Sequence, residues 1–72
     1  MKFMKYGVVI ERSENGFGAY VPDLPGCAAL GDTVEDVRRL IESAVVMHLD
    51  AMRADGDPIP EPATIFDYVE VA

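Results

Sequence analysis

The stretch GFGAYVPDLPGCAALGDT, residues 16–33, holds most of the backbone-shaping residues of this 72-residue chain. It opens with a short alternating segment and continues with a turn, PDLPG at residues 22–26. In this turn two prolines restrict φ and remove backbone donors, and a glycine allows the chain to reverse. A short apolar segment follows at 27–30, and Thr33 is a residue type that caps helix N-termini. The stretch predicts strand, turn, strand and helix start in direct succession.

Upstream of this stretch, residues 3–12 alternate in polarity with a period near two. The apolar face of the alternation consists of Met4, Tyr6, Val8 and Ile10. Asn15-Gly16 follows, and Asn-Gly between apolar segments is a strong hairpin signal because both residues tolerate positive φ. With a return strand at 17–21, these features predict a three-stranded antiparallel meander.

Downstream, apolar residues recur at spacings of three and four from Val34 to Met52, which is typical of an amphipathic helix. Thr33 is the expected N-cap, with Asp36 three residues on in position to reach back as in a capping box. Asp55-Gly56 is the expected end, because glycine accommodates the left-handed conformation there. A helix of roughly 20 residues would be about 30 Å long and would cover the meander.

After the helix, three prolines within residues 57–62 predict a stiff connector. Residues 65–71 regain strand character, with Ile65, Val69 and Val71 on one face. Phe66 and Tyr68 fall on the other face. The predicted order is β-β-β-α-β in a single domain over residues 1–72, an α+β fold with one helix on one face of the sheet.

The chain has thirteen acidic and six basic residues and a formal net charge of −7. Such a surface disfavours nucleic acid, whose binding needs clustered Lys and Arg. It suits a basic partner, although simple solubility explains an acidic charge equally well. One cysteine and one histidine exclude an internal disulfide and an ordinary zinc site, so we expect no metal and no cofactor.

A chain of this length buries only a thin core, and self-association is a common support for such domains. Several apolar residues fall on the sheet face that one helix cannot cover: Phe3, Val9 and Phe66. We therefore expect a homo-oligomer, a dimer or tetramer. No apolar stretch approaches the ~18 residues that span a bilayer, and no signal-peptide pattern follows the N-terminal lysines. With its lone cysteine, the chain is expected to be cytoplasmic and not bound to membranes.

The segments YVPDLPGC at residues 20–27 and GDTVE at 31–35 together resemble the signature of HicB-type antitoxins. The resemblance extends to His48-Leu49, to DGDPIPEP at 55–62 and to Tyr6 and Glu11. It implies a β-β-β-α-β domain related to a pared-down ribonuclease H fold, whose role is to bind and neutralise a small basic RNA-cleaving toxin of the HicA type. Many members carry a C-terminal DNA-binding module. Because this sequence stops at Ala72, we expect that module to be absent.

Under this hypothesis the protein is not an enzyme, and its acidic surface occludes the basic RNA-binding surface of the toxin. The rigid turn could hold Asp23 and Leu24 outward as a contact point, or serve only the fold. On the helix, Val46 falls on the polar side and would lie at the centre of any surface presented to a partner. The predicted contact residues are Asp23, Leu24, Glu35, Glu42, Val46 and Asp50.

Two alternatives stay open. The chain could be a stand-alone oligomeric binding or scaffold module without a toxin. It could also be a degenerate nuclease with metal-binding carboxylates chosen from Glu11, Asp23, Asp32 and Glu42. The ordinary structural uses of Asp in turns and beside helix caps make the nuclease the weaker hypothesis. His48 and Cys27 are interpreted as partly or fully buried structural residues.

Overall fold

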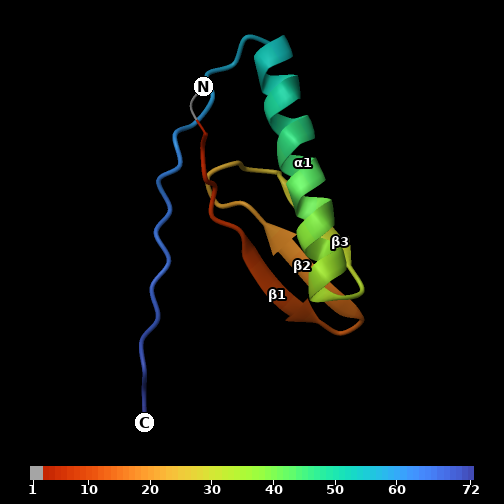
Figure 1. Cartoon of the computed structure of the whole chain (residues 1–72), viewed down its shortest axis with the longest axis vertical. Helices are drawn as coiled ribbons and strands as arrows, with labels where there is room; N and C mark the ends of the chain where they lie inside the picture. Colours follow the sequence, from red (N-terminus) through yellow and green to blue (C-terminus); the bar gives the residue numbers. More distant parts are fainter. Residues whose placement is uncertain (1–2) are drawn as a thin grey trace.

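The computed structural model describes residues 3–72 and contains three strands followed by one helix (Figure 1). The strands are β1 (Val9–Ser13), β2 (Gly16–Tyr20) and β3 (Ala28–Gly31), and the helix is α1 (Val34–Ala54). The strands form one antiparallel sheet in the order β1-β2-β3, and α1 lies across one face of it. The predicted α+β class, the meander and the position of the helix are confirmed.

The first strand is shorter than the residues 3–12 that alternation predicts. In the ladder Val9 lies opposite Tyr20, the last residue of β2. The chain then continues through Val21 into the turn that begins at Pro22. Residues before Val9 therefore have no ladder partner, although they continue along the same side of the molecule (Figure 1).

The hairpin turn is displaced by one residue from the predicted position. Ser13 lies opposite Gly16, so Glu14 and Asn15 form the two-residue turn, and Asn15 keeps a negative φ. Gly16 is needed for a different reason: a Cβ there would lie 2.4 Å from the carbonyl oxygen of Gly31. The close approach of the hairpin to β3 therefore selects glycine.

The turn between β2 and β3 closes with three backbone hydrogen bonds. The Val21 N–H donates to Cys27 O (3.2 Å), the Leu24 N–H to Val21 O (3.0 Å) and the Cys27 N–H to Leu24 O (3.0 Å). Gly26 has a φ of 87°, a conformation that few other residues adopt. These contacts direct the Leu24 side chain inward, where only 1% of its surface is exposed.

Both ends of α1 follow the sequence closely. Thr33 Oγ1 accepts the Asp36 N–H at 3.0 Å, the predicted N-cap. The Asp36 carboxylate does not reach back as predicted but binds Arg39 at 2.6 Å. At the other end, the Gly56 N–H donates to Arg53 O (3.1 Å) and the Asp57 N–H to Met52 O (2.9 Å). With Gly56 at a φ of 74°, these bonds form a Schellman cap.

The core lies between α1 and the inner face of the sheet, and the turn closes one side of it. Its buried members are Ala19, Val21, Leu24, Cys27, Val37, Ile41 and Leu49. Gly31 allows the sheet and the helix to approach closely, because a Cβ there would lie 2.8 Å from the Val37 nitrogen. Residues 3–72 contain no helix apolar and long enough to cross a membrane.

The strand predicted at residues 65–71 is not formed. Residues 57–72 have no regular secondary structure, and the last part of the chain runs on while β1 turns away from it (Figure 1). A strand exists only as part of a ladder, and no described strand accompanies this segment. Ile65, Val69 and Val71 remain more than four-fifths exposed, at 91%, 83% and 87%. We call residues 65–71 the C-terminal tail.

Candidate partner-binding surface

Of the two turn residues predicted as contacts, one is directed into the core and the other is bonded to another part of the chain. Leu24 is almost completely buried in the core, so its prediction as an outward contact is wrong. The cause is the hydrogen-bonded turn, which brings both Val21 and Leu24 against the helix. Asp23 is half-buried, and its carboxylate is occupied by another part of the chain.

The Asp23 carboxylate holds Ala63 and Thr64, which lie just before the C-terminal tail; we call residues 60–64 the tail root. Oδ2 accepts the Ala63 N–H at 3.0 Å and the Thr64 N–H at 3.1 Å, and Oδ1 accepts the Thr64 hydroxyl at 2.9 Å. The bond from the Ala63 amide, followed by those from Thr64, lowers the pKa of Asp23, because each donor favours the ionised form. The structure thus gives Asp23 a structural role across 40 residues of sequence, which no local pattern could indicate.

The four predicted contact residues on α1 are all exposed: Glu35, Glu42, Val46 and Asp50. Val46 is 56% exposed, and two further apolar side chains are comparably open: Met47 at 71% and Leu40 at 48%. Leu40 belongs to the apolar spacing between Val34 and Met52 that predicts the core-facing side of the helix, but the structure leaves it exposed. The exposed apolar residues of α1 are therefore a larger set than the sequence predicts.

The charge on α1 is more balanced than the net charge suggests. Asp36 pairs with Arg39, and Asp50 pairs with Arg53 at 3.5 Å, while Glu35 and Glu42 make no ion pair within residues 3–72. By contrast, residues 55–72 contain five acidic residues and no Lys or Arg. Most of the acidic excess of the protein thus lies beyond the helix.

A groove of about 410 Å³ separates α1 from the N-terminal segment. Its walls come from residues 4–10 on the sheet side and residues 38–46 on the helix side. Most of the lining is apolar, and Arg38, Glu42 and Val46 belong to the helix wall. Two of the predicted contact residues, Glu42 and Val46, therefore border one apolar groove, whereas Glu35 and Asp50 do not.

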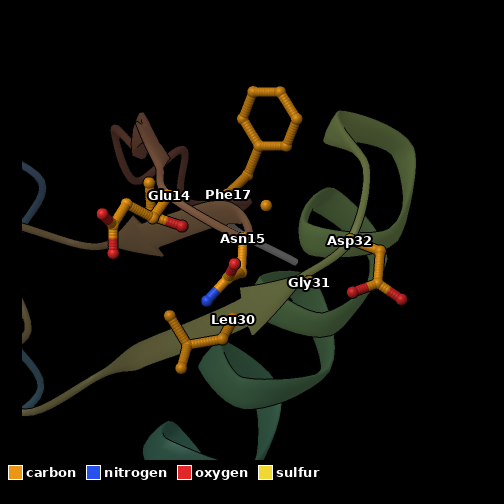
Figure 2. A pocket seen from close by; sticks show the side chains of 8 residues that line it. Glu14, Asn15, Phe17, Leu30, Gly31 and Asp32 are labelled. Atoms are coloured by element: carbon orange, nitrogen blue, oxygen red, sulfur yellow. The ribbon is translucent and has the colours of Figure 1, made fainter.

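A second hollow, of about 530 Å³, lies at the end of the β1-β2 hairpin (Figure 2). Glu14 and Asp32 both line it, but Figure 2 shows their side chains on opposite sides of the hollow. Acid–base catalysis by a carboxylate pair needs both groups directed at one substrate. This hollow lacks that arrangement.

The carboxylates considered for a nuclease are spread over separate elements. Glu11 lies on β1, Asp23 in the turn, Asp32 before α1 and Glu42 on α1. Within residues 3–72 no three His, Cys, Asp or Glu side chains are grouped so that they could hold a metal ion. Cys27 is buried, and desolvation raises the pKa of its thiol, which opposes formation of a reactive thiolate.

Comparison with known proteins gives a consistent result. Residues 6–71 match the family described as HicB_like antitoxin of bacterial toxin-antitoxin system. The chain is 35% identical over 71 residues to antitoxin HicB 2 of Photorhabdus laumondii, covering 97% of this chain and 51% of that protein. It is 40% identical over 52 residues to a UPF0150 protein of Helicobacter pylori, covering 72% of each.

A third relative, a 14.9 kDa protein of Haemophilus phage HP1, is 32% identical over 66 residues, covering 92% of this chain and 50% of that protein. The chain thus spans about half the length of the phage protein and of the Photorhabdus antitoxin. Among solved structures, a chain of the HicA3 and HicB3 toxin-antitoxin complex superposes with a TM-score of 0.71 at 33% identity. The superposition covers 83% of this chain and 70% of that one. The chain belongs to the HicB_like antitoxin family of bacterial toxin-antitoxin systems.

Proposed function

We propose that this protein is an antitoxin that binds and neutralises a small basic toxin of the HicA type. The observation that carries the proposal is the likeness, at 33% identity, to a chain of the HicA3 and HicB3 complex. Membership of an antitoxin family, which is not a known enzyme family, agrees with a binding role. The net charge of −7 suits a basic partner and opposes direct binding to nucleic acid.

The exposed side of α1 is the surface that we assign to the toxin. It combines apolar area at Val46 and Met47 with carboxylates at Glu35 and Glu42 that make no ion pair within residues 3–72. Partly apolar patches with charged rims are typical of protein–protein interfaces. Binding a basic partner through these carboxylates has a small free-energy cost, since no existing ion pair has to be broken. Covering the RNA-binding surface of the toxin would block its activity by occlusion.

Co-purification with a small basic protein encoded next to this chain tests the proposal. The native chain should capture that protein and relieve its toxicity when the two are co-expressed. The variant Glu42→Lys reverses a charge in the centre of the assigned surface, and Val46→Asp removes its apolar contact. Both should weaken capture by at least about tenfold, since truncating a central contact costs more than ~1.4 kcal/mol.

Glu14→Lys is the matched control, because Glu14 is exposed in the hairpin turn, away from α1. It makes the same change in net charge and should leave capture intact. Failure of the native chain to bind any neighbouring basic protein would refute the antitoxin role. Equal weakening by Glu42→Lys and Glu14→Lys would refute the assigned surface, because only bulk charge would then matter.

A further inference from the structure

The C-terminal tail has the sequence of a strand and the exposure of an unfolded segment. Tyr68 is 93% exposed, and Ile65, Val69 and Val71 are exposed to a similar degree. Five of its seven residues are apolar or aromatic, with only Asp67 and Glu70 charged. Contiguous apolar exposure of this kind marks a surface that another chain covers.

The root of the tail is nevertheless fixed to the body of the protein. The Asp23 carboxylate holds Ala63 and Thr64, and the Tyr6 hydroxyl donates to Pro60 O. The Phe66 ring lies directly over Gly7, where a Cβ would collide with it. The tail therefore leaves the body from a defined point beside the N-terminal segment, and Figure 1 shows it projecting beyond the sheet.

The sheet offers a receiving edge on the same side of the molecule. Within residues 3–72, β1 pairs only with β2, so its other edge presents unpaired backbone groups. Residues 3–13 contain Lys5, Arg12 and one acid, Glu11, and so have a net charge of +1, whereas β3 at the opposite edge contains no charged residue. Charge complementarity thus favours the β1 edge for a tail that is acidic, and it opposes pairing of two tails with each other.

The groove beside β1 supplies a place for the inward side chains of an added strand. Ile65, Asp67, Val69 and Val71 share one face of the tail by the period of two. The groove is mainly apolar, like that face, and its helix wall carries one cation, Arg38, and one carboxylate, Glu42, neither of which makes an ion pair within residues 3–72. Asp67, the single acidic residue on the inward face of the tail, is therefore able to pair with Arg38 at the groove.

From these features we infer that two copies of this chain exchange their C-terminal tails, each tail adding as a fourth strand to β1 of the other copy. The exchange gives every sheet a covered edge and buries the apolar face of the tail against the groove. It is reciprocal, as in a closed two-fold dimer. The inference does not depend on the antitoxin role, because it uses the tail and the free edge of β1. Glu42 and Val46 line both the groove and the surface assigned to the toxin, so the tests below change Val69, Asp67 and Arg38 instead.

The first test is the mass of the full chain in solution, measured by light scattering during gel filtration. The native chain should have twice the 7.9 kDa of one copy. Val69→Asp should be monomeric, with an unchanged helix signal in circular dichroism, because Val69 is 83% exposed in the single copy. Leu30→Asp is the matched control, since Leu30 is 79% exposed on β3, and it should remain dimeric.

A monomeric native chain, or a dimer that survives Val69→Asp, would overturn the inference. A dimer lost in Leu30→Asp but kept in Val69→Asp would also overturn it and would place the interface at β3.

The second test distinguishes exchange between copies from closure of the tail on its own chain. Asp67→Arg and Arg38→Asp should each be monomeric alone. In a dimer of either variant, residue 67 of each tail would meet a like charge at residue 38 of the other copy. An equimolar mixture of the two variants should form a heterodimer, since residue 67 of each tail then meets an opposite charge at residue 38 of the other copy. If the mixture stays monomeric, or if each variant dimerises alone, the pairing of tail and groove is wrong.

Discussion

Residues 9–54 and residues 57–72 both contain alternating apolar residues, but only the first region buries them. Ala19 on β2 is only 4% exposed, whereas Val69 in the tail is 83% exposed. The first region closes its own turns, caps and ladders within a few residues of each apolar side chain. The second is attached through contacts at Tyr6, Gly7 and Asp23 and has no ladder. Apolar alternation thus predicts burial only where a partner strand or helix is within reach.

The largest expected effect comes from breaking the core of the first region. Leu24→Ala should lower the free energy of unfolding by about 2–5 kcal/mol, because it empties a site that is 1% exposed. In a domain of this size that is a large fraction of the total stability. Urea denaturation followed by circular dichroism measures it. Leu30→Ala, at a site 79% exposed, should change almost nothing, and equal losses would contradict the observed burial.

Loss of the helix cap should have the next largest effect. Thr33→Ala removes the acceptor of the Asp36 N–H and should cost about 1 kcal/mol, again in the first region. Thr33→Ser retains the hydroxyl and should recover most of that loss in the same urea titration. A full loss in the serine variant would show that the methyl group rather than the hydroxyl stabilises this helix end.

Tyr6→Phe tests how firmly the second region is attached. It removes the hydroxyl that donates to Pro60 O while keeping the ring, so the expected cost is about 0.5–1.5 kcal/mol. Amide exchange should increase around residues 60–64 and stay unchanged in α1. Tyr20→Phe is the control, because Tyr20 is 44% exposed on the sheet. Faster exchange throughout α1 would mean that the tail root and the body unfold together.

The smallest effect is a local dependence on pH. The pKa of Asp23 is lower in the folded chain than in the unfolded one, so the hold of its carboxylate on the tail root is present above the unfolded pKa and is lost as pH falls through the folded pKa. The Thr64 amide resonance should follow this titration in NMR spectra. Asp23→Asn should abolish the dependence, whereas Asp32→Asn should preserve it. A Thr64 shift that persists in Asp23→Asn would assign the titration to another group.

Much of the first region was predictable because its determinants are local. Pro22 to Gly26 indicate the turn, Thr33 the N-cap, and Gly56 the C-terminal cap of α1. The hairpin turn was displaced by one residue, because the register and the approach of Gly31 decided it. The first strand begins at Val9 rather than at residue 3, since β2 offers no partner to the earlier residues. Glu42 and Val46 were correctly placed on the exposed side of the helix, because helical periodicity is a property of the sequence alone.

The predicted roles that failed required contacts between distant residues. Asp23 looked like a surface residue, and its bonds to Ala63 and Thr64 span about forty positions. Leu24 looked exposed because its turn is rich in proline, and only the packing of that turn on α1 directs it inward. The strand at 65–71 was predicted from a correct alternation, but strand formation depends on an edge that the single copy does not bring alongside it.

By itself the sequence determined the order of three strands and a helix, the helix caps and the acidic charge, since propensity, periodicity and composition act over a few residues. The tertiary structure alone decided that Leu24 is core, that Asp23 holds the tail root and that the groove lies beside β1. It also decided that the last apolar segment is left exposed. These outcomes depend on which surfaces meet, and burial is a property of the packed pair rather than of either segment.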